Sequence, residues 1–375
     1  MVLVGGLIGY LWMASESIEA ELREQRPQIT VKVKLEPPKS DQAGLGAGDE
    51  GKTAERATLG KKEVIASEQR AKVVDKPEET GQAEIERPQK SAATAGAADA
   101  GVVLHPHPDL KLIEETDQGP LPRIDEEGRQ PWRVYSRPFD EMDTRSRIAI
   151  VVTHLGLAPQ QTQDAIVKLP SEVTLGFAPY ARGLNDWVQQ ARDNGHEVLI
   201  GLPMEPSDYP RNDPGPNGLM LANSQEENIK RLNWVLSRAT GYVGVFDFMG
   251  SRFTAEEQSL KPILEQLKNR GLMMLDTRDS SLSTMGAVAQ DLRLPYSAVD
   301  IAPDLEPNRG SIDRQLKKLS ELARTEKYSV AIVRPLPITM LRLRRWIERL
   351  DSRKFVLAPI SAVVGPFKAQ KPPKF

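Results

Sequence analysis

The stretch that decides the fold is Val243-Gly-Val-Phe-Asp-Phe-Met-Gly-Ser-Arg-Phe-Thr254. Its apolar first part predicts a buried strand at residues 243–246, and the remainder predicts a loop that leaves the carboxyl end of that strand. Thr254-Ala-Glu-Glu257 follows directly, and a threonine three residues before a glutamate is the capping-box signal for a helix start. A second capping box, Ser224-Gln-Glu-Glu227, predicts another helix start upstream. Together these signals predict a helix that starts near Ser224, then a strand at residues 243–246, a loop, and a second helix that starts near Thr254.

The same alternation of strand and helix patterns extends outward from this unit. Further strands are predicted at residues 148–152, 173–177, 198–201, 272–275, 296–301, 329–333 and 355–357. Helices are predicted at residues 159–169, 184–194, 312–324 and 340–350, besides those that start near 224 and 254. Short connections between such units imply right-handed crossovers and a parallel sheet. The fold class predicted is α/β: a distorted (β/α) barrel of seven or eight parallel strands, with an open doubly wound sheet as the alternative.

The chain before this domain has a different composition. Residues 1–14 are uncharged and mostly apolar, which suits a signal-peptide core or an uncleaved membrane anchor. A buried helix without a targeting role is the alternative. The basic flank expected before such a core is missing, so we hypothesise that the real start lies upstream of Met1. Residues 15–145 are rich in Glu, Lys, Gln, Ala, Gly and Pro, which predicts a disordered linker, although residues 132–138 are expected to lie against the domain. The domain itself is predicted at 146–365, with a flexible tail at 366–375.

Composition excludes several classes of function. The net charge of −2 gives no electrostatic basis for binding nucleic acid. The absence of cysteine excludes disulfides, thiolate catalysis and cysteine-based zinc sites. Only four histidines exist, so a histidine-rich metal centre is nearly excluded.

Polar residues recur where the predicted strands end. In parallel α/β folds the carboxyl ends of the strands meet the ligand, so their joint recurrence favours a site, although structural ion pairing explains them about equally well. The candidate residues are Thr153, His154, Glu205, Asp247, Ser251, Arg252, Asp276, Arg278, Asp300, Asp304 and Arg334. By contrast, His196 precedes the third strand of the domain and is expected to orient a turn at the opposite end. An arginine cluster on the last long helix is interpreted as a solvated face that an anionic polymer could use, and consists of Arg342, Arg344, Arg345 and Arg349.

Four segments carry a resemblance to a known family. They are Ile148-Ala-Ile-Val-Val-Thr-His-Leu-Gly156, Gly195-His-Glu-Val-Leu-Ile-Gly-Leu-Pro-Met-Glu-Pro206, Met249-Gly-Ser-Arg-Phe-Thr254 and Leu275-Asp-Thr-Arg278. These segments resemble the divergent branch of the polysaccharide deacetylases over residues 147–364. The resemblance implies a distorted (β/α) barrel and a role in carbohydrate metabolism. It also implies a periplasmic protein held at the inner membrane by its N-terminal segment, with a glycan or cell-envelope component as ligand.

The resemblance also implies a chemistry that this chain lacks the residues to perform. In the wider family an Asp acts as base on a water, while a second Asp and two His hold a divalent metal. Here Thr153 stands at the base, His154 at the ligand Asp, and Gly201 and Phe248 at the two ligand His. A further family His corresponds to Arg334. Threonine has no usable pKa for a general base, and neither glycine nor phenylalanine can ligate a metal.

Two functional hypotheses follow from these substitutions. The favoured one is a non-catalytic homologue, without a cofactor, that binds a glycan or a protein partner in the envelope. The alternative is an active metal-dependent deacetylase in which His154 and Asp247, with Glu205 or Asp276, hold zinc or a similar divalent metal. A third possibility is a scaffold that binds no glycan. Should no metal site exist, Asp247 is expected to pair with Arg252 or Arg278.

Overall fold

The structure, a computed structural model, describes residues 102–364. The predictions for residues 1–14, for residues 15–101 and for the tail at 366–375 lie outside the described residues.

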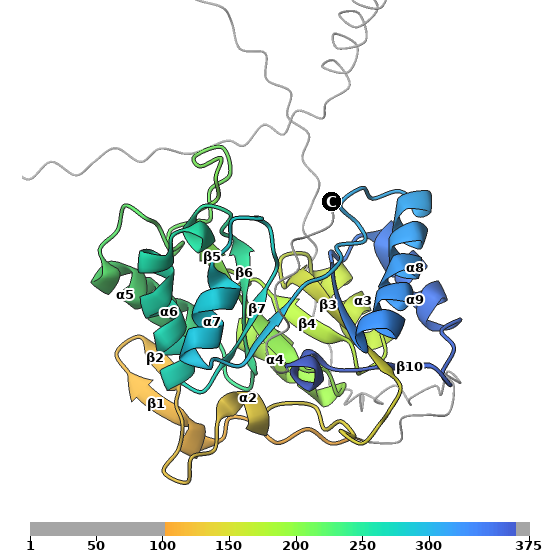
Figure 1. The fold of residues 1–375 in the computed structure, drawn as a ribbon. Coiled ribbons are helices and arrows are strands. Elements are labelled where there is room, and N and C mark those ends of the chain that lie inside the picture. Colours follow the sequence, from red (N-terminus) through yellow and green to blue (C-terminus); the bar gives the residue numbers. More distant parts are fainter. Residues whose placement is uncertain (1–101, 365–375) are drawn as a thin grey trace, which may run out of the picture. The chain divides into compact units, whose positions relative to one another are not determined.

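Eight parallel strands form the central sheet, and seven of them make a nearly closed barrel (Figure 1). They are β3 (Ser146–Leu155), β4 (Thr174–Phe177), β5 (Val198–Met204), β6 (Gly244–Met249), β7 (Met273–Asp276), β8 (Tyr296–Ala298), β9 (Tyr328–Val333) and β10 (Phe355–Leu357). The order is β10-β3-β4-β5-β6-β7-β8, and β9 pairs with β3. A bridge between Ile301 and Ala331 joins the chain after β8 to β9 and so completes the ring. The predicted distorted barrel is therefore confirmed.

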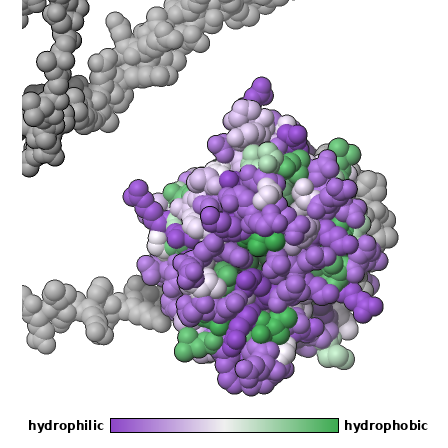
Figure 2. All heavy atoms as spheres, turned by 90° about the vertical axis from the view of Figure 1, so that its left-hand side faces the viewer, coloured by the Kyte–Doolittle hydropathy of each residue, from purple (hydrophilic) through white to green (hydrophobic). Residues whose placement is uncertain are grey.

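Helices follow the strands and cover the outside of the barrel. They are α3 (Pro159–Lys168), α4 (Leu184–Asp193), α5 (Gln225–Leu236), α6 (Glu257–Asn269), α7 (Met285–Leu292), α8 (Arg309–Glu326) and α9 (Pro337–Ile347). The eight-residue α7 was not predicted from the sequence, because its short apolar run gives too little periodicity. The face on the α5 and α6 side is mostly hydrophilic, with only scattered apolar patches (Figure 2). Within residues 102–364 no helix has both the length and the apolarity that crossing a bilayer requires.

Alternation along the strands builds two separate cores. Ile148 and Ile150 of β3 belong to the outer core between the sheet and the helices, whereas Ala149 and Val151 belong to the core inside the barrel. Successive side chains of a strand point to opposite faces, so the same division applies to every strand of the ring. Phe246 on β6 is among the largest fully buried side chains and lies in the inner core.

Residues that were predicted as linker close the amino end of the barrel. These residues form the 3₁₀ turn η1 (Leu110–Leu112), the hairpin of β1 (Ile113–Thr116) and β2 (Gly119–Pro122), and the short helix α2 (Pro131–Val134). The C-terminal 3₁₀ turn η3 (Ile360–Val363) lies at the same end of the barrel. Leu112 and Tyr135 are buried in the inner core together with Ile360. The prediction of a disordered linker is thus wrong for residues 102–131 and 139–145, which sequence composition alone could not distinguish from a solvated tether, whereas the expectation that residues 132–138 lie against the domain is confirmed.

The strand, loop and helix unit around residues 243–257 differs from its prediction at the end of the strand and at the start of the helix. Strand β6 runs on to Met249, so Asp247 and Phe248 lie in the strand and pair with β5. The Thr254 hydroxyl donates to the Gly250 carbonyl (2.8 Å) rather than capping a helix, and α6 begins only at Glu257. The capping box at Thr254 is therefore wrong. The one at Ser224 is confirmed, because its hydroxyl accepts the amide of Glu227 at 3.2 Å.

Candidate functional site at the carboxyl ends of the strands

The inner face of the barrel mouth is formed by residues that continue the inner-core alternation. Thr153 follows Val151 on β3 and Phe248 follows Phe246 on β6, while Arg334 comes directly after Val333, the last residue of β9. Thr153 is buried, and its hydroxyl lies 3.4 Å from the Val333 carbonyl. The mouth thus presents a hydroxyl, an aromatic ring and a guanidinium.

His154 stands at the edge of this mouth in a left-handed backbone conformation (φ 60°). Its Nδ1 lies 2.9 Å from the Thr153 hydroxyl, and its ring meets the Phe248 ring edge-on with centroids 4.9 Å apart. Burial lowers the pKa of His154 below its ordinary value, and the nearby Arg334 lowers it further, while Asp304 acts in the opposite direction. At neutral pH the imidazole is therefore uncharged.

A buried ring occupies the space that a side chain at Gly201 would need. A Cβ added at Gly201 would lie 3.0 Å from Cζ of Phe246, and one added at Gly176 would lie 2.8 Å from Cε1 of the same ring. A side chain at either glycine would therefore crowd the Phe246 ring, which lies in the inner core. The interior is filled under the mouth, at the position where the family resemblance implies a ligand histidine.

Asp247 and Asp276 do not face the mouth. Asp247 follows Val245 on the outer face of β6, and its two oxygens accept the amide and the hydroxyl of Thr277, both at 2.6 Å. Burial raises the pKa of Asp247 well above its usual range, and the neighbouring Asp276 and Asp279 raise it further. Burial also raises the pKa of Asp276, whose carboxylate accepts the hydroxyl of Tyr296 at 2.8 Å.

Three arginines at the strand exits are each matched with one carboxylate. Arg252 donates to Glu205 at 2.7 Å, and Arg278 lies 3.9 Å from Asp300. The predicted pairing of Asp247 with Arg252 or Arg278 is therefore wrong, because these arginines reach acids on other strand exits while Asp247 faces away.

The third arginine, Arg334, donates from its backbone amide to the Asp304 carboxylate at 2.9 Å and from its guanidinium to the Asp304 carbonyl. Within this pair and the Arg252–Glu205 pair the acid is the buried partner. The Glu205 and Asp304 side chains are 5% and 4% exposed, whereas those of Arg252 and Arg334 are 57% and 42% exposed. The mouth consequently offers guanidinium groups that are fixed by a buried acid and still face solvent.

Several remaining candidates hold the loops rather than line the mouth. The second oxygen of Glu205 accepts the amide of Leu221 (2.7 Å), and the Ser251 hydroxyl accepts the amide of Ser207 (2.9 Å), so both tie down the loop after β5. Asp300 accepts the amide of Val330. At the opposite end His196 lies between the carbonyls of Val173 and Ile166, at 2.8 and 2.9 Å, which confirms its predicted role in orienting a turn.

The donor set at the mouth does not fit a divalent metal. His154 lies beside a hydroxyl and an aromatic ring and near both Arg334 and Asp304, and the Asp304 carboxylate is already bonded to the Arg334 amide, while the positive charge of Arg334 disfavours a bound cation. Asp247 lies on the other face of the sheet among Thr277, Asp276 and Asp279. Over residues 102–364 no group of three His, Cys, Asp or Glu side chains could hold a metal ion.

Sequence analysis missed the residues that explain this arrangement. The sequence pattern predicts Phe246 only as a strand residue and does not single out Thr277, the partner of Asp247. A sequence signal existed for Phe246, because glycines on two neighbouring strands indicate space for a large side chain between them. None existed for Thr277, since only the packing of β6 beside β7 brings it to Asp247.

The fold defines a (β/α) barrel protein with polar side chains at the strand exits, and comparison with known proteins narrows this class. Residues 150–364 match the family described as divergent polysaccharide deacetylase, and the chain belongs to that family. An uncharacterized protein from Haemophilus influenzae is 28% identical over 209 residues, which cover 55% of this chain and 72% of the relative. The uncharacterized protein YibQ from Escherichia coli is 25% identical over 205 residues, covering 54% of this chain and 63% of YibQ.

A solved structure is also similar. The crystal structure of the uncharacterized protein ATU2773 from Agrobacterium tumefaciens C58 is 35% identical and superposes with a TM-score of 0.64. The match covers 65% of this chain and 99% of that structure. The similarity therefore spans most of the described domain.

Proposed function

We propose that this domain is a non-catalytic member of its family that binds a cell-envelope glycan at the barrel mouth. The observation that carries the proposal is that Thr153, Phe248 and Arg334 stand at the mouth, where the family resemblance implies a base and metal ligands, with Phe246 filling the interior beneath. Threonine, phenylalanine and arginine can neither activate a water nor hold a metal, and His154 alone does not make a metal site, so we assign the mouth a binding role without hydrolysis.

The Arg252–Glu205 and Arg334–Asp304 pairs supply the chemistry for binding. Each guanidinium is oriented by a buried carboxylate and still exposes N–H groups to solvent. Sugar hydroxyls accept from such fixed donors, and because each pair is close to neutral the site favours hydroxyl groups over a strongly charged ligand. The left-handed backbone at His154, Met249 and Arg278 places strained residues at three strand exits, as is typical of functional sites.

Calorimetric titration of the full chain with chitotetraose, a neutral N-acetylated glycan, tests the proposal. We expect binding that Arg334→Ala weakens about tenfold, since a hydrogen bond from a charged group contributes about 1.5–3 kcal/mol. Arg353→Ala is the matched control, because the Arg353 side chain is 92% exposed and lies outside the mouth. Acetate release that requires a divalent metal and disappears in His154→Ala would overturn the non-catalytic assignment.

A protein partner is the second candidate for the same mouth. Its support is the exposure of three leucines on strand-exit loops: Leu157 (55%), Leu282 (73%) and Leu305 (80%). Exposed apolar side chains around a polar centre are typical of protein interfaces. Leu282→Ser with Leu305→Ser should abolish in-cell crosslinking from a probe at residue 157 while leaving the glycan affinity unchanged, and a loss of glycan affinity instead would assign these leucines to the glycan.

The envelope location is part of the proposal and rests on the family membership. An alkaline phosphatase fusion after residue 364, active only outside the cytoplasm, tests it. Loss of that activity on removal of residues 1–14 is expected if this segment directs export, and full activity without them would contradict an anchoring or export role.

A further inference from the structure

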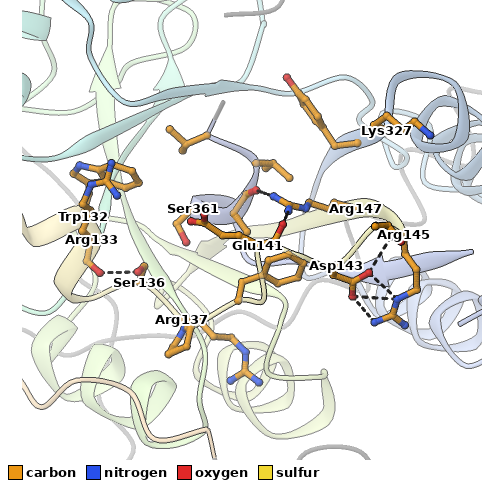
Figure 3. Close-up of a pocket in the computed structure, with 17 residues that line it drawn as sticks. Trp132, Arg133, Ser136, Arg137, Glu141, Asp143, Arg145, Arg147, Lys327 and Ser361 are labelled. Atoms are coloured by element: carbon orange, nitrogen blue, oxygen red, sulfur yellow. Dashed lines mark hydrogen bonds and ion pairs between the residues drawn. The ribbon is translucent and has the colours of Figure 1, made fainter. Parts of the chain in front are cut away.

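A cavity of about 880 Å³ opens at the amino end of the barrel, opposite the mouth. It lies between α2, the segment leading into β3, the start of β9 and η3 (Figure 3). The lining includes five Lys or Arg residues and two Asp or Glu residues, so its charge is positive: Arg133, Arg137, Arg145, Arg147, Lys327, Glu141 and Asp143. Cavities of this size are typical of small-molecule sites.

Two of these cations are already committed to the fold. Arg145 is held by the Asp143 carboxylate through contacts of 2.5–3.1 Å. Arg137 is buried and donates to the Gly195 carbonyl at 3.0 Å. Neither charge is therefore counted toward a ligand.

The other three cations make no ion pair, although the Asp143 carboxylate that holds Arg145 also lies close enough to feel the charge of Arg147. Arg147 donates to the carbonyls of Ala362 (2.8 Å) and Glu141 (3.0 Å), and its guanidinium lies over the Phe139 ring. Arg133 stacks on Trp132, with 4.5 Å between the guanidinium carbon and the ring centroid, and Lys327 is exposed. In the part of the chain that the structure describes, no carboxylate lies within ion-pair distance of these three side chains.

The three cations are also spread across the cavity. Figure 3 shows Arg133 on one side and Lys327 on the opposite side, with Arg147 between them. A single small anion could meet only part of this set, whereas a ligand with two separated anionic groups could meet both sides. Oxyanions are the preferred partners of guanidinium and ammonium groups, so the two anionic groups of the ligand would be carboxylates or phosphates.

We propose that the cavity at the amino end of the barrel binds a small ligand that carries at least two carboxylate or phosphate groups, through Arg133, Arg147 and Lys327. The site is independent of the glycan site at the mouth. Its ligand is charged, whereas the paired side chains of the mouth suit neutral hydroxyls.

Titration of the full chain with two-anion probes tests this. Digalacturonate and fructose 1,6-bisphosphate represent the carboxylate and phosphate sources, and cellobiose and acetate are the neutral and single-anion controls. We expect at least one two-anion probe to bind about tenfold or more tightly than either control, with an affinity that falls as salt is added. Binding by neither two-anion probe at about 1 mM and low salt, or equal binding of cellobiose, would overturn the proposal.

Two exposed cations in the same backbone conformation provide a matched pair of variants. Lys327 (φ 72°) and Arg293 (φ 54°) both follow a helix in the left-handed region, where glycine is well tolerated. Lys327→Gly should weaken the two-anion probe about tenfold, and Arg293→Gly, which lies outside the cavity, should leave it unchanged. Equal effects of the two variants would contradict the site.

Two further measurements separate this site from others. Arg133→Gln removes a cation without touching the barrel core and should also weaken the two-anion probe, while Arg334→Ala should alter only chitotetraose binding. Vesicles of phosphatidylglycerol form the last arm. If they bind the chain, lose binding with Lys327→Gly and are not displaced by either soluble probe, the cavity faces a lipid surface and the small-ligand proposal is wrong.

Discussion

Two glutamates, one at each end of β5, are both nearly inaccessible to solvent yet have opposite surroundings. Glu197, at the amino end, accepts the backbone amides of Arg137 (3.1 Å) and Ser361 (3.0 Å) and the Ser361 hydroxyl (2.5 Å). Glu205, at the carboxyl end, accepts one amide and one half-exposed guanidinium. The first joins the two chain segments that close the barrel, whereas the second orients a group that faces solvent. The glutamate at the amino end of β5 thus stabilises the fold, and the one at the carboxyl end orients a polar group that faces solvent.

The largest expected effect would come from removing the two glutamates in turn. Glu197→Ala leaves three donors without an acceptor, the buried Arg137 amide and the two partly buried donors of Ser361, and should lower the free energy of unfolding by about 4 kcal/mol. Glu205→Ala should cost about 2 kcal/mol, because the Arg252 guanidinium can turn to water. Urea unfolding of the full chain measures both, and equal costs would remove the distinction between the ends.

A smaller effect is expected from restoring a histidine at Gly201. Its side chain would collide with the Phe246 ring, and overpacking of this kind costs about 2 kcal/mol. Phe246→Leu should relieve the collision, so the double variant should be more stable than the sum of the two single effects predicts. Additive effects in this cycle would mean that Phe246 does not block the position.

The pH dependence of stability provides a third test, on the outer face of the sheet. The pKa of Asp247 is raised in the folded state by burial and by Asp276, so its stabilising contribution is complete below its unfolded pKa of about 3.9 and is lost as pH rises through the folded pKa. Asp247→Asn keeps the shape and removes the titration. Relative to this variant, the wild-type chain should lose stability as pH rises from about 4, by about 1.4 kcal/mol per unit of pKa shift. Parallel pH curves for the two proteins would contradict this.

The smallest expected effect concerns His154. Because Arg334 lowers the pKa of this imidazole, Arg334→Gln should move it upward, toward its ordinary value. Titration of the His154 ring proton by NMR measures the change. Arg252→Gln is the control, since Arg252 pairs with Glu205 and is not among the groups that perturb His154. An equal shift in both variants would argue against a specific contact between the ring and Arg334.

A structural feature was predictable where the residues that determine it lie close together in the sequence. The barrel was predictable because its strands are short β-branched runs, and the Ser224 cap because its partner is three residues away. The boundary of the domain was not, since residues 102–145 are polar and become part of the barrel only where Leu112 and Tyr135 meet the inner core. The position of Asp247 relative to His154 was not predictable for a similar reason, because whether β6 continues through Asp247 decides which face that carboxylate occupies.

The sequence by itself determined the strand and helix alternation, the family, and which residue types stand at the strand exits, because periodicity and residue identity are local properties. Only the tertiary structure decided which acid meets which arginine, that Phe246 fills the barrel beneath the mouth, and that three cations without an acidic partner surround a cavity at the opposite end. Those outcomes depend on contacts between residues up to more than two hundred positions apart, as between Arg147 and Ala362, and such contacts are set by the packing of the closed sheet.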